Sequence, residues 1–317
     1  MKILANDGIS QSGINALKKA NFEVITEKVE QDQLIDYINE NDIKVLLVRS
    51  ATTARKELID ACPNLKIIGR GGVGMDNIDV EYAKSKNIKV INTPAASSES
   101  VAELVFSHLF NMVRFVYDSN RNMPLDGDTK FKELKKAYAK GSELKGKTLG
   151  IIGFGRIGQE VAKRAIGLGM NVIACDKHIK EVDLSLSFFD NQELTFKIST
   201  IPMNELMKNS DYISLHIPLI GDKAVIGEKE FDLMKDGVGI VNAARGGVID
   251  ETALLSAIEK GKVSSAGLDV FENEPNPSIK VLMNPNISLT PHIGAATIEA
   301  QDRIGTELAS KIIDYLN

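Results

Sequence analysis

The sequence predicts an α/β protein with two doubly wound parallel-sheet domains. Short apolar runs alternate with segments of helical spacing from residue 2 onward, and a second alternation begins at residue 147 with a glycine-rich turn. Such alternation is typical of parallel sheets whose crossovers are helices. The chain has 317 residues, 43% hydrophobic and 26% charged, so two soluble domains with cores of their own are expected.

The first alternation covers residues 2–92 and is expected to form five strands and two helices. The strands are expected at 2–6, 24–25, 44–48, 65–68 and 89–92, and the helices at 11–20 and 32–38. No glycine fingerprint occurs in residues 2–48, so this first part of the chain is not expected to hold a dinucleotide.

Two of these strands lead into loops that carry arginines. Ligands of parallel sheets gather at the carboxyl ends of the strands, which makes both loops candidate sites. In the second loop four glycines occur within six positions, and backbone N–H groups there are expected to form an anion nest. A solvated arginine and a purely structural loop are the alternatives. The candidates are Arg49, Ser50, Arg70, Gly71, Gly72 and Val73.

A nearly continuous apolar run at 100–116 predicts a helix that is buried on several sides. We expect it to link two domains and to bury surface against a second subunit, with His108 as a satisfied core histidine. The following segment, 130–147, contains seven lysines and is interpreted as a solvated linker, from which Lys136 could reach an anionic substrate.

The stretch from Lys147 to Asp176 reads as strand, turn, helix and strand. Its turn has the pattern G-x-G-x-x-G, formed by Gly153, Gly155 and Gly158. The first glycine allows a sharp turn, the second lets a pyrophosphate approach the backbone, and the third lets the helix pack on the strand. Asp176 stands where a carboxylate can bind ribose hydroxyls. This context predicts a dinucleotide site, with a glycine-rich structural turn as the alternative.

The second alternation continues to the end of the chain, after a polar, turn-rich region that follows Asp176. Strands are expected at 148–152, 171–175, 211–216, 238–241, 266–270 and 287–289, and helices at 159–168, 203–207, 251–259 and 301–316.

Three strand ends after the dinucleotide motif each deliver one polar residue: Arg245, Glu274 and His292. Arginine can hold a carboxylate bidentately, histidine can exchange a proton near neutrality, and a glutamate can orient the histidine ring. Together they indicate hydride transfer on a 2-hydroxy or 2-keto acid. Each residue alone also fits a structural role: an ion pair, a turn residue or a capped loop histidine.

Composition excludes several other classes of function. The formal net charge of −5 disfavours nucleic-acid binding. No apolar run is long enough to span a membrane and no signal-peptide core is visible, so a cytoplasmic location is expected. Cys62 and Cys175 fit no metal or redox spacing, and the four histidines are scattered, so no metal site is expected.

Motifs along nearly the whole chain resemble the D-isomer-specific 2-hydroxyacid dehydrogenase family. The matching segments are GRGGVGMDNID at 69–79, SVAEL at 100–104, GKTLGIIGFGRIG at 146–158, LHIPL at 215–219, NAARGGVIDE at 242–251, GLDVFENEP at 267–275 and TPHIGA at 290–295. One departure is Ala296, which stands where many family members carry serine.

The resemblance implies NAD as cofactor and Arg245, Glu274 and His292 as the catalytic set. It also implies contacts of the substrate phosphate with Arg49 and Arg70. The implied cofactor-binding residues are Gly153, Gly155, Arg156, Ile157, Gly158, Asp176, His216, Ala243, Ala244, Arg245, Asp269, His292, Gly294 and Ala295.

The resemblance further implies a Rossmann NAD domain, residues 98–292, inserted into a discontinuous flavodoxin-like substrate domain, residues 1–97 and 293–317. A homodimer through the NAD domain is expected. The closest likeness is to members that oxidise 3-phospho-D-glycerate in serine biosynthesis, here without a C-terminal regulatory domain. A glyoxylate or hydroxypyruvate reductase, or a scaffold that senses NAD, are the alternatives.

Overall fold

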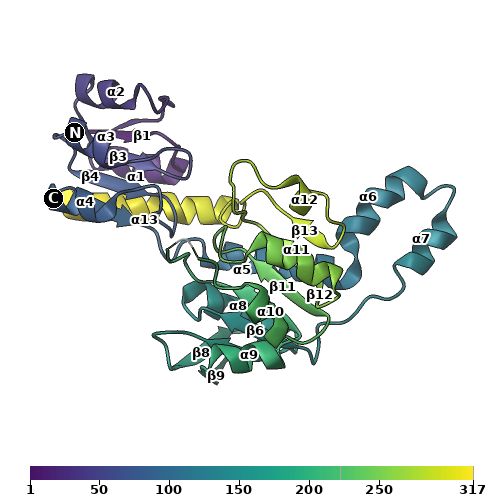
Figure 1. Cartoon of the computed structure of the whole chain (residues 1–317). Helices are drawn as coiled ribbons and strands as arrows, with labels where there is room; N and C mark the ends of the chain where they lie inside the picture. The colour runs from purple at the N-terminus through teal and green to yellow at the C-terminus, as the bar shows by residue number, and fades with distance from the viewer. Residues whose placement is uncertain (222, 317) are drawn as a thin grey trace. The chain divides into compact units, whose positions relative to one another are not determined.

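A computed structural model describes residues 1–221 and 223–316 and divides the chain into two compact units. Unit 1 comprises Met1–Ser100 and the chain from Ala295 onward, and unit 2 comprises Val101–Gly294. Each unit is built on a parallel β-sheet with helices on both faces, so the predicted α/β class is confirmed (Figure 1).

Among the described residues, unit 1 contains a five-stranded sheet in which every pairing is parallel. Residues of its central strand are buried at nearly every position, as a sheet covered on both faces requires. Its strands, in spatial order, are β2 (Glu23–Ile25), β1 (Lys2–Ala5), β3 (Ile43–Val48), β4 (Ile67–Arg70) and β5 (Lys89–Asn92).

Five helices cover the two faces of this sheet. They are α1 (Gln11–Lys19), α2 (Leu34–Glu40), α3 (Lys56–Ala61), α4 (Val80–Ser85) and α13 (Ile298–Leu316). Apolar residues of α1 and α13 share one core with the sheet, and those of α2, α3 and α4 share the other. Helices α1 and α13 touch at two glycines: a Cβ on Gly13 would lie 2.7 Å from the carbonyl oxygen of Gly305.

In the described part of unit 2, six strands form a parallel sheet. Its strands, in spatial order, are β13 (Ile287–Leu289), β12 (Val263–Leu268), β11 (Val238–Asn242), β10 (Tyr212–Leu215), β6 (Thr148–Ile152) and β7 (Asn171–Cys175). The helices around it are α5 (Ser98–Arg114), α8 (Arg156–Gly167), α9 (Met203–Asn209), α10 (Glu228–Leu233), α11 (Glu251–Glu259) and α12 (Ile279–Leu282). Helices α5 and α8 share one core, and α9, α10 and α11 share the other.

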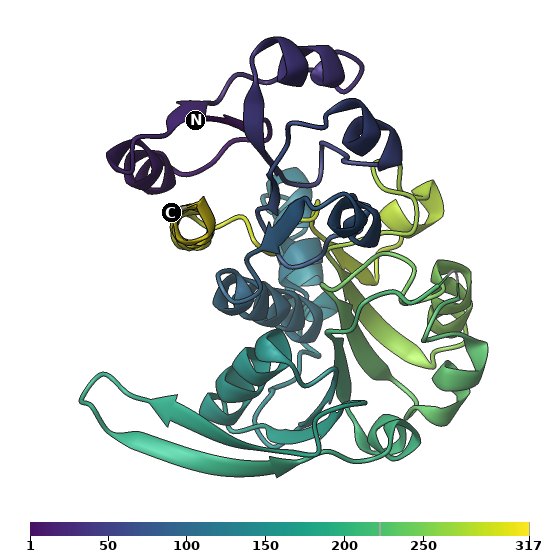
Figure 2. The same cartoon turned by 90° about the vertical axis from the view of Figure 1, so that its left-hand side faces the viewer.

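The region after Asp176 is an antiparallel hairpin, so its interpretation as turn-rich was wrong (Figure 2). Strands β8 (Glu181–Ser187) and β9 (Glu193–Ser199) alternate apolar and polar residues with a period of two. Leu184 faces Phe196 and Leu186 faces Leu194, which places the apolar side chains on one face. Leu184 and Leu186 of β8 are buried in the core that α8 shares.

Helix α5 is followed by an arm of two short helices, α6 (Val116–Asp126) and α7 (Phe131–Ala137) (Figure 1). Neither helix of this α6–α7 arm contains a buried residue. The lysine-rich segment is therefore solvated as expected, but it is helical in part rather than a plain linker. Helix α5 itself buries one broad face and leaves Phe110 exposed, so it is not covered on all sides within one chain.

Within the described part of the chain, no helix is long and apolar enough to cross a membrane, and no cluster of His, Cys, Asp or Glu could hold a metal ion. Cys62 and Cys175 are buried free thiols, and burial raises the pKa of each to about 11. Neither cysteine has the lowered pKa that a reactive thiol needs.

His108 is a buried and satisfied core histidine, as predicted. Its two ring nitrogens lie 2.9 Å from Ser288 Oγ and 3.0 Å from Thr290 Oγ1, and the residue is 1% exposed. Burial lowers the pKa of His108 to about 4. The folded protein therefore keeps this ring neutral at a pH where an unfolded chain would already have protonated it.

Acidification is expected to destabilise unit 2 through His108. The contribution of the neutral His108 ring to the free energy of unfolding is complete above pH ~6.5. It is lost as the pH falls towards 4, because only the unfolded chain takes up the proton in that window. The loss amounts to about 1.4 kcal/mol per pH unit and about 3 kcal/mol in total. Thermal unfolding between pH 7 and 4.5 should show a steeper fall in Tm for the wild type than for His108→Gln. Parallel curves would contradict this assignment.

Candidate active site

The turn between β6 and α8 has the geometry that each of its glycines was predicted to provide. Gly153 has a φ of 93°, and a Cβ there would lie 2.4 Å from the carbonyl oxygen of His216. A Cβ on Gly158 would lie 2.2 Å from the carbonyl oxygen of Gly153, so helix and strand pack at van der Waals contact. At Gly155 the Cβ position is open, with nothing within 4 Å. The turn thus leaves the backbone at the start of α8 accessible to a phosphate group.

Asp176 follows β7 and caps three backbone N–H groups. One carboxylate oxygen accepts from Phe154 at 2.8 Å, and the other accepts from His178 at 2.8 Å and Ile179 at 3.0 Å. Burial alone would raise the pKa of Asp176, but these N–H groups outweigh it and lower the pKa. The carboxylate is ionised, only partly buried and directly beside the glycine turn, which fits a ribose diol.

The ends of β10 and β11 bring His216 and Ala243 to the same edge of the sheet, since these strands are paired in parallel. His216 Nε2 lies 2.8 Å from Ser214 Oγ, whereas its Nδ1 is a buried atom without a hydrogen-bond partner among the described residues. Burial lowers the pKa of His216 to about 3, so its ring is neutral. A buried polar atom without a partner beside the glycine turn is consistent with a bound cofactor at this edge.

His292 and Glu274 form a direct pair. His292 Nδ1 lies 2.8 Å from one oxygen of Glu274, and the other oxygen accepts from the backbone N–H of Phe271 at 3.0 Å. Because a carboxylate only accepts, Nδ1 carries the hydrogen and Nε2 of the neutral ring keeps its lone pair. His292 itself has a φ of 55°, in the left-handed region. The pair presents a histidine whose free nitrogen can take up a proton.

Arg245 lies in the loop after β11. Asn242, which the sequence did not single out, shapes this loop: its side chain donates to the carbonyl oxygen of Arg245 at 2.9 Å and accepts from Ala244 N–H at 3.0 Å. The loop touches the segment that leads to Glu274, because a Cβ on Gly246 would lie 1.7 Å from the carbonyl oxygen of Phe271. The Arg245 loop and the Glu274 loop are thus packed backbone to backbone.

A reciprocal contact of two glutamates reinforces this packing. Glu272 accepts from the backbone N–H of Glu251 at 2.9 Å, and Glu251 accepts from that of Glu272 at 2.9 Å. Burial, together with the charge of Glu272, raises the pKa of Glu251. Local sequence patterns do not predict this contact, because the two residues lie on different elements.

Asp269 is buried and holds the loop that carries His292. One oxygen accepts from Thr290 Oγ1 at 2.6 Å and from Ile293 N–H at 2.8 Å, and the other accepts from Gly294 N–H at 2.8 Å. Burial raises the pKa of Asp269, although the same three donors counteract it. Both oxygens therefore bind groups of the protein itself on either side of His292.

Unit 1 brings Arg49 and Arg70 to the ends of two paired strands. Val48 is in register with Arg70, the last residue of β4, and Arg49 follows β3. Asp7 fastens the first loop: one oxygen accepts from Arg49 N–H at 2.6 Å and from Thr52 N–H at 3.1 Å. Burial lowers the pKa of Arg49, and the charge of Asp7 opposes that effect.

The glycine loop after β4 does not form the predicted anion nest at Gly71 and Gly72. The N–H of Gly71 donates to the carbonyl oxygen of Val48 at 2.9 Å, and the N–H of Gly72 donates to the carbonyl oxygen of Arg70 at 3.0 Å. Both N–H groups therefore bind the backbone of the protein itself. The glycines instead provide space, because a Cβ on Gly72 would lie 1.7 Å from Arg70 Nη1 and one on Gly71 3.5 Å from Arg49 Cγ.

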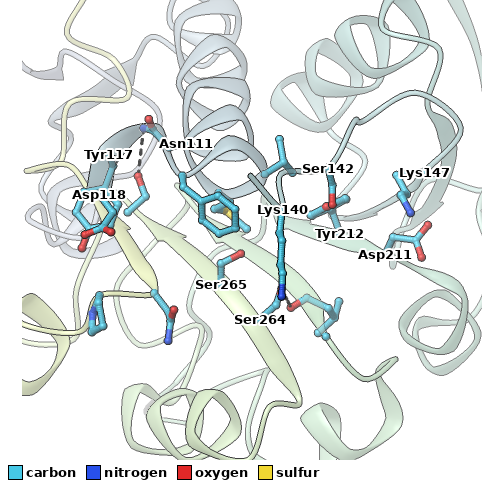
Figure 3. A pocket seen from close by; sticks show the side chains of 18 of the residues that line it. Asn111, Tyr117, Asp118, Lys140, Ser142, Lys147, Asp211, Tyr212, Ser264 and Ser265 are labelled. Carbon is cyan, nitrogen blue, oxygen red and sulfur yellow. Dashed lines mark hydrogen bonds between the residues drawn. The ribbon is translucent and has the colours of Figure 1, made fainter. Parts of the chain in front are cut away.

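A cavity of about 450 Å³ in unit 2 lies elsewhere, at the amino ends of the strands (Figure 3). Asn111, Tyr212, Ser264 and Asn286 are among the residues that line it. None of the predicted site residues lines this cavity, because those of unit 2 follow the carboxyl ends of its strands and the others belong to unit 1.

Comparisons with known proteins agree with this geometry. The family description "D-isomer specific 2-hydroxyacid dehydrogenase, NAD binding domain" matches residues 106–294. A hydroxypyruvate reductase of Thermotoga maritima is 45% identical and covers 99% of this chain and 98% of its own length. A D-3-phosphoglycerate dehydrogenase of Methanocaldococcus jannaschii is 42% identical over 98% of this chain, and the chain spans 57% of that relative's length.

Among solved structures, a 3-phosphoglycerate dehydrogenase of Entamoeba histolytica with bound NAD⁺ superimposes with a TM-score of 0.77 at 30% identity. It covers 99% of this chain and 95% of its own. The family description covers more than half of the chain and corresponds to unit 2, which contains the glycine turn and Asp176. The chain therefore belongs to the D-isomer-specific 2-hydroxyacid dehydrogenase family and contains its NAD-binding domain.

Proposed function

We propose that this dehydrogenase oxidises 3-phospho-D-glycerate at C2 to 3-phosphohydroxypyruvate, the step that leads towards serine. The observation that carries the choice of a phosphorylated substrate is the pair of arginines at neighbouring strand ends of unit 1. A small 2-hydroxy acid has one carboxylate, and we assign that group to Arg245 of unit 2. Two further guanidinium groups suit a second anionic group, since arginine binds phosphate bidentately.

The residues of unit 2 have distinct tasks in this reaction. NAD⁺ supplies the acceptor for the hydride from C2. His292 Nε2 accepts the proton of the C2 hydroxyl, while Glu274 holds the ring through Nδ1 at 2.8 Å and stabilises the imidazolium that forms. Arg245 holds the substrate carboxylate.

The cofactor is expected to be NAD in preference to NADP. The ionised Asp176 would repel the 2′-phosphate of NADP and would lose its hydrogen bonds to the ribose. Lys177 and His178 follow directly and soften that repulsion, so we expect a preference of about tenfold in kcat/KM, a difference of about 1.4 kcal/mol. Equal kcat/KM with the two cofactors would contradict the role of Asp176.

Hydroxypyruvate reduction is the second candidate. The specific observation in its favour is the relative named hydroxypyruvate reductase, which matches this chain over 98% of its own length. A panel of 2-oxo acids with NADH separates the candidates: 3-phosphohydroxypyruvate should have a higher kcat/KM than hydroxypyruvate or glyoxylate. The reverse order would assign the protein to the reductases.

We further propose that the protein is a homodimer assembled through unit 2. Large apolar side chains are exposed along the end of α5 and the α6–α7 arm, and Leu125 in α6 is 76% exposed. Several large exposed apolar side chains on consecutive elements are typical of a subunit interface. These side chains are Phe110, Phe115, Val116, Met123, Leu125 and Phe131.

The dimer is expected to dissociate when charge is placed on this surface. Leu125→Glu combined with Phe131→Glu should give the mass of a monomer in light scattering, because burying two carboxylates in an apolar interface is costly. Ile279, which is 75% exposed on α12, provides a matched control, and Ile279→Glu should leave the mass unchanged. A monomeric wild type would refute the dimer.

A further inference from the structure

We propose that His108 is a positioning residue for proton transfer by His292, acting through Thr290 and Asp269. The inference rests on the proposed dehydrogenase function and assigns it a residue outside the cofactor and substrate sites. All groups concerned belong to unit 2.

A continuous chain of hydrogen bonds connects α5 with the loop that carries His292. Ser288 Oγ lies 2.9 Å from His108 Nδ1, and Thr290 Oγ1 lies 3.0 Å from His108 Nε2. Thr290 Oγ1 is 2.6 Å from the Asp269 carboxylate. That carboxylate in turn accepts from the backbone N–H groups of residues 293 and 294, directly after His292.

The direction of each bond follows from the carboxylate. Asp269 can only accept, so the hydroxyl of Thr290 donates to it and must itself accept from His108 Nε2–H. The neutral ring then carries no hydrogen on Nδ1, which accepts from the hydroxyl of Ser288. Asn111 N–H₂ donates to Ser288 Oγ at 3.3 Å, which completes the chain at the wall of the cavity (Figure 3).

Packing fixes the position of the His108 ring. A Cβ on Gly267 would lie 2.6 Å from His108 Cβ, so the absence of a side chain at this point of β12 lets α5 approach the strand. The ring spans the gap between α5 and β13 and meets Ser288 within that strand and Thr290 just after it. The hydrogen bonds from the His108 ring to Thr290 and from Thr290 to Asp269 therefore start from a ring that is held in place by the core.

Asp269 must hold its two oxygens towards the loop for His292 to keep its position. His292 has a φ of 55°, a conformation that needs support from its surroundings. If Thr290 no longer receives a hydrogen bond from His108, its hydroxyl can rotate away from the carboxylate. A small displacement of the loop would then misplace His292 Nε2, and such displacements can cost about 10²-fold in rate.

Two substitutions of His108 separate positioning from packing. In His108→Gln the amide nitrogen reaches the place of Nε2 and can donate to Thr290. In His108→Asn the shorter amide reaches only the place of Nδ1, so the bond to Thr290 is lost. We expect kcat to fall about tenfold in His108→Asn, with KM and the Kd of NADH within about twofold, and to remain within about threefold of wild type in His108→Gln.

Thr290 provides an independent test of the same chain. Thr290→Val, which removes the hydroxyl at nearly constant volume, should reproduce the loss in kcat, and Thr290→Ser should restore it. The result that would overturn the proposal is an equal kcat for His108→Gln and His108→Asn, or losses confined to KM or Tm, which would leave His108 a packing residue only. A wild type without turnover on any 2-oxo acid would overturn both the proposed function and the positioning role of His108. An active wild type with the same kcat in His108→Gln and His108→Asn would overturn only the positioning role.

Discussion

His292→Ala is expected to lower kcat by about 10²- to 10⁴-fold while the Kd of NADH stays nearly unchanged. This range is the typical contribution of one general acid–base group. The contact that motivates the proposed role is that of His292 Nδ1 with Glu274 at 2.8 Å, and the proposal assigns the substrate proton to Nε2. Steady-state reduction of a 2-oxo acid by NADH gives kcat, and NADH fluorescence titration gives the Kd, so the two quantities are measured separately.

The substitution is not expected to affect folding, because the side chain of His292 is 40% exposed and its removal leaves no core cavity. The Tm of His292→Ala should therefore match that of the wild type. Glu274→Gln keeps an oxygen that can accept from Nδ1, whereas Glu274→Leu does not, so the leucine variant should lose more activity. A His292→Ala enzyme within tenfold of wild-type kcat would remove His292 from the mechanism.

Much of the framework follows from local patterns in the sequence. A buried parallel strand must be apolar over several residues, and each predicted run of this kind in the two sheets corresponds to a strand within a few residues. The glycine turn is also predictable from a local pattern, because the tight contacts at Gly153 and Gly158 leave no room for a side chain. The carboxyl ends of the strands then place Arg245, Glu274 and His292 in loops of one sheet.

Other features depend on contacts between distant residues, and local patterns do not reveal them. The hairpin β8–β9 is an exception, because its period-two alternation of apolar and polar residues is a local signal for two half-buried strands that the interpretation as a turn-rich region overlooked. The N–H groups of Gly71 and Gly72 do not contribute to the expected nest, because the carbonyl oxygens of Val48 and Arg70 accept from them. The bonds of Asp269 to Thr290 and of His108 to Ser288 join separate elements, so only the fold brings them together.

Arg70→Ala is expected to lower kcat/KM for 3-phosphohydroxypyruvate by about 10- to 150-fold, mostly through KM. Loss of a charge-assisted hydrogen bond typically costs about 1.5–3 kcal/mol, which corresponds to that range. Activity on unphosphorylated hydroxypyruvate should change much less, because that substrate lacks the group that Arg70 would bind. The informative quantity is therefore the ratio of kcat/KM for the two substrates, measured for wild type and variant.

Two further variants separate charge from shape and from general effects on unit 1. Arg70→Lys keeps a positive charge but loses the planar fork, so it should fall between wild type and Arg70→Ala. Arg55, which pairs with Asp79 at 3.0 Å on the surface of unit 1, serves as the matched control, and Arg55→Ala should leave the ratio unchanged. If Arg70→Ala lowers kcat/KM for both substrates in equal proportion, Arg70 does not bind the substrate phosphate. The protein would then be a general D-2-hydroxyacid dehydrogenase, because the arginine pair is the observation that favours a phosphorylated substrate.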